Sequence, residues 1–215
     1  MKRVAFFLTF IFLIILTNKV LGVPTQPWVN PNQGYTHYWT YNFDDANIPP
    51  TITSEGGNWD PGSDPDWTIT GPVTIVNGHL GIHNATQDSV ADIKILIPNQ
   101  HYDYLDKYFW FSYDWYSSSG YVAHPTYGTN DTNSSIINVE CPDNLNTNNH
   151  IEGFVIFHPQ PDNEWLNIHL GAPANSTIWI DNLKIGSTCI PEPSSIFLFT
   201  SSLISFILLR KKLKR

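Results

Sequence analysis

The chain has 215 residues and a formal net charge of −8, and its charges are unevenly distributed. Residues 23–190 contain three lysines and no arginine against 18 acidic residues, a formal charge of −15, whereas the other basic residues cluster at the two ends. So acidic a segment repels nucleic acid and anionic lipid, which excludes a nucleic-acid-binding role, and its length suits a single domain.

Residues 1–22 have the layout of a secretory signal peptide. Lys2 and Arg3 make the start positive, residues 4–16 are apolar and uncharged, and Gly22 supplies a small residue for cleavage. This order predicts that the secretion machinery exports the chain across the inner membrane and that cleavage follows Gly22. An uncleaved anchor is the alternative, but the apolar run is shorter than the roughly 20 residues of a spanning helix.

The exported segment, residues 23–189, has the pattern of an all-β domain. Asn77-Gly78 lies between two short apolar runs and is a strong hairpin signal, because a type I′ turn needs positive φ at both central positions. Short strand-like runs separated by turn residues predict a two-sheet β-sandwich of about eight or nine strands. The expected strands cover residues 38–43, 73–76, 79–82, 91–97, 107–116, 136–140, 151–157, 165–170 and 178–185.

The strand at residues 107–116 suggests a sugar-binding surface. Successive side chains of a strand point to opposite faces, so Phe109, Phe111, Tyr113 and Trp115 are expected in the core. The opposite face then carries aromatic rings and a carboxylate, which suit stacking on a sugar and hydrogen bonding to its hydroxyls. The predicted platform consists of Tyr108, Trp110, Asp114, Tyr116 and Trp165. The alternative is that these aromatic residues only reflect strand composition and that a loop or second sheet covers the face.

Both cysteines, Cys141 and Cys189, lie in the exported segment. Two cysteines in an oxidising compartment usually pair, so a disulfide between them is expected, with two unpaired thiols as the alternative.

The chain ends with an apolar segment and a basic tail. Residues 194–209 predict a transmembrane helix, which is short for a hydrocarbon core of about 30 Å unless the basic side chains reach to the interface. The tail at residues 210–215 holds five basic residues. By the positive-inside rule this tail stays in the cytoplasm, which places the acidic domain outside. A buried helix of the domain is the alternative.

Together with the motif Pro191-Glu192-Pro193, this end resembles the PEP-CTERM sorting signal over residues 190–215. The resemblance implies recognition and removal of the signal by an exosortase, an integral-membrane cysteine protease/transpeptidase of Gram-negative bacteria that make exopolysaccharide. The protein would then be anchored only transiently, and would reach the cell envelope, the outer surface or the medium. The two prolines fix φ and remove two hydrogen-bond donors, which keeps the chain extended before the membrane.

The exported domain resembles galactose-binding-like and other carbohydrate-binding jelly rolls. The similarity lies in Phe43-Asp44-Asp45, in the Asn77-Gly78 hairpin and in the run from Trp179 to Leu183. It implies a jelly-roll-like sandwich with a structural Ca²⁺ ion held by Asp181 with Asp44 or Asp45, and carboxylate oxygens suit that cation. An ordinary turn at these aspartates is the alternative.

The chemistry-bearing residues favour a non-enzymatic protein. The chain has no GxSxG motif and no compact ExDxE motif, although Glu140, Glu152 and Glu164 could form carboxylate pairs. The leading expectation is a structural or adhesive role associated with exopolysaccharide in a biofilm. A lectin-like carbohydrate-binding module is the first alternative, and a secreted glycoside hydrolase is the second.

Overall fold

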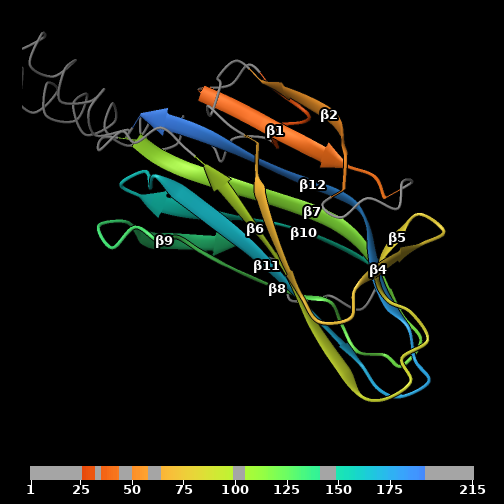
Figure 1. Ribbon diagram of the computed structural model, residues 1–215. Helices are drawn as coiled ribbons and strands as arrows, with labels where there is room; N and C mark the ends of the chain where they lie inside the picture. Colours follow the sequence, from red (N-terminus) through yellow and green to blue (C-terminus); the bar gives the residue numbers. More distant parts are fainter. Residues whose placement is uncertain are drawn as a thin grey trace, which may run out of the picture. The chain divides into compact units, whose positions relative to one another are not determined.

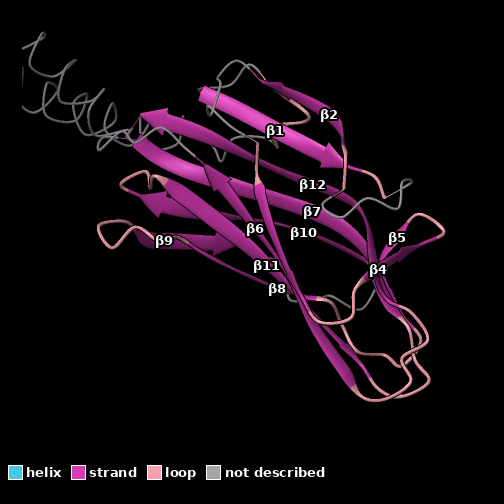
Figure 2. Cartoon of the chain, viewed as in Figure 1, coloured by secondary structure: helices cyan, strands magenta, loops and turns pink. Residues whose placement is uncertain are grey.

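The structure, a computed structural model, describes residues 26–31, 35–43, 50–57, 64–98, 105–140 and 149–191. Every regular element in these ranges is a β-strand (Figure 2). No helix long and apolar enough to cross a membrane occurs among them. The predicted signal peptide and the predicted transmembrane helix lie outside the described residues.

The larger sheet, sheet A, has eight strands, and every described pairing within it is antiparallel. Six of them follow the spatial order β2-β1-β12-β7-β10-β9, and the β4–β5 hairpin joins through β5 to β12. Their bounds are β1 (Tyr35–Tyr41), β2 (Ile52–Gly57), β4 (Thr74–Val76), β5 (His79–Ile82), β7 (Leu105–Ser117), β9 (Ser135–Glu140), β10 (His150–His158) and β12 (Ile178–Pro191).

The smaller sheet, sheet B, has four antiparallel strands in the order β3-β6-β11-β8. They are β3 (Asp66–Thr70), β6 (Ser89–Pro98), β8 (His124–Gly128) and β11 (Asn163–Ala172). Figure 1 shows the two sheets as two layers, with β6, β8 and β11 in front of β7, β10 and β12. This arrangement confirms the expected all-β sandwich.

The core lies between the sheets and follows the alternation of the strands. Phe109, Phe111, Tyr113 and Trp115 of β7 are at most 6 % exposed, and Leu166, Ile168 and Leu170 of β11 are fully buried, as the alternation predicts. Each such side chain contributes about 1.5–3 kcal/mol relative to an exposed position. The side chains that alternate with them point to the outer faces of the two sheets.

The predicted hairpin turn is confirmed. β4 and β5 pair with Val76 opposite His79, and Asn77 and Gly78 have φ values of 53° and 80°. A type I′ turn needs positive φ at both positions, which asparagine tolerates and glycine adopts freely.

The described residues form twelve strands, more than the expected eight or nine. The additional ones are β2, β3 and β8, which are outermost in their sheets. β2 and β8 contain few apolar residues, and β3 alternates Trp67 and Ile69 with polar residues but has only five residues. In β8, Pro125 also weakens a strand prediction, although proline is tolerated at the edge of a sheet.

A buried ion pair joins the two sheets. The Lys107 Nζ atom of β7 lies 2.9 Å from the Glu164 Oε1 atom of β11, and both side chains are fully buried. Desolvation raises the pKa of Glu164 to about 7, and the lysine opposes that rise. The inward positions of these strands therefore include one charged contact among apolar neighbours.

Candidate carbohydrate-binding site

The outer face of sheet B carries a groove lined by polar and charged residues and by one tryptophan. The groove has a volume of about 330 Å³. It is lined by Thr68, Thr70, Asp92, Lys94, Thr126, Trp165 and Asn167.

Strand pairing arranges this face in rows across all four strands of sheet B. One row, from β3 to β8, is Thr68, Lys94, Asn167 and Thr126. Adjacent strands lie about 4.8 Å apart, so the row places threonine, lysine and asparagine side chains next to one another across the sheet. The neighbouring rows are Asp66, Leu96, Trp165 and Gly128 on one side, and Thr70, Asp92, His169 and His124 on the other.

Trp165 lies against β8 because its partner there is a glycine. Trp165 is opposite Gly128 in the register, and a Cβ atom added to Gly128 would lie 2.6 Å from the Cζ2 atom of the ring. A methyl group at that position therefore cannot coexist with the present position of the indole. The Lys94 Nζ atom lies 4.9 Å from the centroid of the Trp165 ring, within cation–π range.

Asp92 supplies an ionised hydrogen-bond acceptor in the groove. Its Oδ1 atom accepts a hydrogen bond from Asn167 Nδ2 at 2.9 Å and lies 3.1 Å from His169 Nδ1. The bond from Asn167 and then the contact with His169 lower the pKa of Asp92 below its ordinary value. A groove that contains a flat ring, a fixed carboxylate, an amide and threonine hydroxyls matches the hydroxyls and C–H faces of a sugar.

The structure divides the predicted sugar platform between the two sheets. Trp165 is on the outer face of sheet B, whereas Tyr108, Trp110, Asp114 and Tyr116 are on β7 of sheet A. Trp110 is 5 % exposed and packs against Phe154 at a centroid distance of 4.6 Å. The five residues therefore do not form one surface.

Residues 26–31 lie on the part of sheet A that carries Trp110. Gln26 Nε2 donates a hydrogen bond to Glu152 Oε1 at 2.5 Å, and Trp28 packs against the cluster of Trp110, Phe154 and Ile156. The Lys184 Nζ atom lies 5.9 Å from the centroid of the Trp28 ring. A sugar could reach the face of Trp110 only after this segment moved away.

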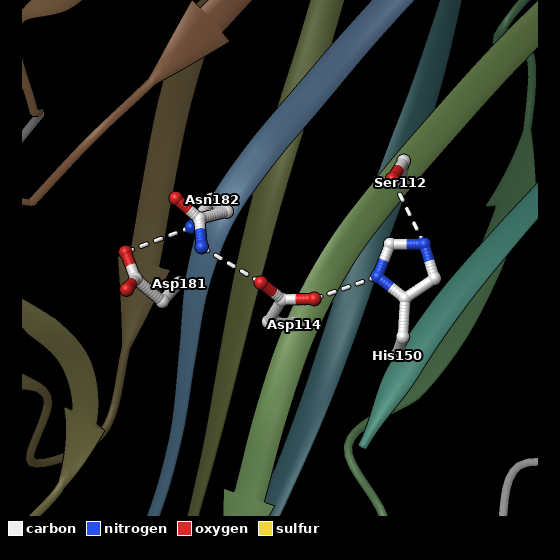
Figure 3. A network of polar contacts seen from close by, with 5 residues as sticks. All are labelled: Ser112, Asp114, His150, Asp181 and Asn182. Carbon is white, nitrogen blue, oxygen red and sulfur yellow. Dashed lines mark hydrogen bonds and ion pairs between the residues drawn. The ribbon is translucent and has the colours of Figure 1, made fainter. Parts of the chain in front are cut away.

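At the other end of this face, Asp114 is the centre of a polar network (Figure 3). His150 Nδ1 lies 2.6 Å from Asp114 Oδ1, and Asn182 Nδ2 donates to Asp114 Oδ2 at 2.7 Å. The other nitrogen of His150, Nε2, lies 3.4 Å from Ser112 Oγ. Serine, histidine and aspartate are thus in the order of a hydrolase triad.

The surroundings of this network do not suit nucleophilic catalysis. Ser112 is only 3 % exposed, and its hydroxyl faces the ring of His150. Glu152 is the cross-strand neighbour of Ser112, so a carboxylate lies beside the serine, whereas a triad enzyme needs hydrogen-bond donors there for the developing negative charge. The orienting Asp114 is 41 % exposed, which weakens its electrostatic effect on the histidine. The network is better explained as a link between β7, β10 and β12.

Two of the three glutamates considered for hydrolysis, Glu140 and Glu152, are on the same face of sheet A, and Glu164 is not on that face. Glu164 is buried between the sheets, whereas Glu140 is opposite Phe154 and Glu152 is opposite Ser112, both in sheet A. Glu164 therefore cannot share a solvent-filled cleft with the other two.

The predicted calcium site is described only in part, because Asp44 and Asp45 lie outside the described residues. Asp181 Oδ1 accepts a hydrogen bond from the Asn182 backbone N–H at 2.7 Å, and its Oδ2 atom lies 3.5 Å from His79 Nδ1. Within the described ranges, no three acidic, histidine or cysteine side chains are placed to share a metal ion. Calcium at Asp181 remains a prediction.

The predicted disulfide and sorting motif are also described in part. Cys189 is a thiol with 1 % exposure, and burial raises its pKa to about 11, while Cys141 lies outside the described residues. The disulfide remains a prediction. Pro191 ends β12, and Glu192 and Pro193 also lie outside the described residues.

Sequence reasoning identified the outward positions of β11 but not the groove itself. The alternation in the expected strands at 91–97 and 165–170 already places Asp92, Lys94, Trp165 and Asn167 outward. The sequence does not indicate that these two strands, β6 and β11, are neighbours in one sheet. It also does not indicate the edge strands β3 and β8, which complete the groove.

Comparison with known proteins finds no family model, no curated protein and no solved structure that matches the chain.

Proposed function

We propose that the protein is an exported, non-enzymatic β-sandwich that binds polysaccharide in the groove of sheet B. The observation that carries this proposal is that one groove on the outer face of sheet B is lined by Trp165 and by the hydrogen-bonded pair Asp92 and Asn167. The ring offers a stacking surface, and the fixed carboxylate and amide offer directional hydrogen bonds. Binding of this kind suits a structural or adhesive role in an exopolysaccharide matrix.

The two chain ends support delivery to the cell surface. A signal peptide at residues 1–22 exports the chain, and the PEP-CTERM-like segment at residues 190–215 directs it to an exosortase, which removes the tail. The pairing of the first strand, β1, with the last strand, β12, supports the finer assignment of the sandwich as jelly-roll-like.

Polysaccharide binding can be tested with the exopolysaccharide of the producing bacterium and with neutral oligosaccharides, using affinity electrophoresis and calorimetry. Trp165→Ala should weaken binding by at least about tenfold, which corresponds to about 1.4 kcal/mol. Trp179→Ala, which removes a half-buried tryptophan from sheet A, is the matched control and should leave affinity unchanged. Equal affinity of Trp165→Ala and wild type, with both folded by circular dichroism, would contradict the proposal.

Sorting can be tested by the intact mass of the protein isolated from its native host. The expected species lacks both residues 1–22 and the basic tail at residues 210–215. A mature form that retains Lys214 and Arg215 would refute removal of the tail.

A further inference from the structure

We propose that the groove of sheet B prefers glycans that carry protonated amino groups, such as oligomers of glucosamine. This inference rests on the proposed polysaccharide binding and names the chemical class of the ligand. It combines the charge of the whole domain, the ionised carboxylate in the groove and the position of Lys94.

The three lysines of the domain and five of its eight histidines are engaged by other groups. Of the three lysines in residues 23–190, Lys107 pairs with Glu164 in the core, and Lys94 and Lys184 lie over tryptophan rings. Five histidines contact carboxylates at 2.6–3.5 Å, namely His37, His79, His150, His158 and His169. A domain with 18 acidic residues and so little available positive charge repels a polyuronate and attracts a polycation.

The groove itself offers the carboxylate of Asp92 to an ammonium ion. The lowered pKa of Asp92 keeps its carboxylate charged at mildly acidic pH, where sugar amines are protonated. Its hydrogen-bonding neighbours are the amide of Asn167 and the ring of His169. A second carboxylate, on Asp66, is exposed outside the groove, in the same row as Trp165 but two strands away. An ammonium group can therefore form a charge-assisted hydrogen bond here, which is stronger than the bond that a hydroxyl can form.

The position of Lys94 shows that this surface accommodates an alkylammonium group. The Lys94 Nζ atom lies 4.9 Å from the centroid of the Trp165 ring, where the electron-rich face attracts cations. Lys94 is on a flexible four-carbon stem, so its head can swing away from the ring. In the proposed complex one ammonium of the glycan takes the place of Lys94 Nζ on the ring, and the ammonium of another sugar unit contacts Asp92.

The test compares two oligosaccharides of equal length, a glucosamine oligomer and its fully N-acetylated counterpart, at mildly acidic pH with the full-length protein. Wild type should bind the amino form about tenfold more tightly, and this preference should fall as salt screens the charges. Asp92→Asn should abolish most of the preference. Glu140→Gln, which removes an exposed carboxylate from β9, is the control and should retain it.

Lys94→Met gives a second, opposite readout. Removing the competing cation from the Trp165 ring should tighten binding of the amino form several-fold, without tightening binding of the N-acetylated form. A gain of this kind cannot result from misfolding.

The outcomes separate this inference from the proposed function. Equal, salt-insensitive binding of both oligomers, sensitive to Trp165→Ala, would overturn the amino-sugar preference and leave polysaccharide binding in place. Failure of both oligomers and of the native exopolysaccharide to bind would overturn both proposals.

Discussion

Gly128 determines where the indole of Trp165 can lie. Because the hydrogen of this glycine faces the ring, the tryptophan can lie against β8, and any Cβ atom would push it away. We expect Gly128→Ala to weaken polysaccharide binding about as much as Trp165→Ala, with little loss of stability because β8 is an edge strand. Calorimetric affinity and thermal melting measure the two effects.

Gly171→Ala in β11 is the control, since the nearest atom to its added methyl group is Tyr121 Cδ1 at 3.7 Å, an ordinary contact distance. Unchanged affinity in Gly128→Ala would show that the position of the ring does not control binding.

Glu164 is expected to make the protein less stable as pH rises, the opposite of a carboxyl group whose pKa is lowered by folding. Its folded-state pKa of about 7 lies above its ordinary value of 4.5. The folded state therefore holds this proton more tightly than the unfolded state, and the stability that the group contributes below pH 4.5 is lost as pH rises through 7. From pH 5 to pH 8, we expect the free energy of unfolding of wild type to fall relative to that of Glu164→Gln.

Urea titration followed by tryptophan fluorescence measures this difference. Parallel pH profiles of wild type and variant would contradict the raised pKa, whatever the absolute stability of the variant.

At the scale of elements, the alternation of buried and exposed side chains along β12 is interrupted in the middle of the strand. Ile178 and Ile180 face the core, and so do Leu183 and Ile185, so one extra residue lies between the two pairs. Asn182 takes up the irregularity with a φ of 50°, a conformation that asparagine tolerates better than most residues. Both Asp181 and Asn182 are thereby exposed, at least in part, and Asn182 reaches Asp114.

Asn182→Val should destabilise the protein by about 1–3 kcal/mol, because a β-branched residue is strained at positive φ. Asn182→Gly keeps the backbone conformation and loses only the bond to Asp114, so it should cost clearly less. Chemical denaturation of both variants tests the order. If valine proved no worse than glycine, the strain at this position would be refuted.

How far each element could be predicted depended on its burial. The central strands β6, β7, β10, β11 and β12 have continuous or alternating apolar residues, and the sequence alone indicates them. The alternation of β7 also placed Trp110 and Asp114 on the outward face correctly. The cover that residues 26–31 place over Trp110 could not be predicted, because a contact between segments so far apart in the chain leaves no local pattern. The placement of Trp165 and Trp110 on different sheets could not be predicted either, because it depends on the order of the strands, which leaves no local pattern in the sequence.

At the scale of the whole molecule, the formal charge of −15 on residues 23–190 opposes compaction. Salt screens repulsion between exposed carboxylates, with a Debye length of about 10 Å at 0.1 M. We expect the melting temperature to rise when NaCl increases from low to physiological concentration, by about 2–4 °C for each kcal/mol recovered. Differential scanning calorimetry measures the shift. A fall in melting temperature would mean that the histidine–carboxylate pairs outweigh the net repulsion.

The pairing of β12 also determines how the molecule bears a mechanical load. This strand runs from Ile178 to Pro191 with β1 on one side and β7 on the other. A pull on the chain beyond Pro191, directed along the strand, is opposed by the hydrogen bonds to both neighbours at once. Bonds loaded together in shear resist more force than bonds opened one after another. An adhesive domain held by its carboxyl end would thus transmit tension through its best-supported strand while sheet B holds its ligand.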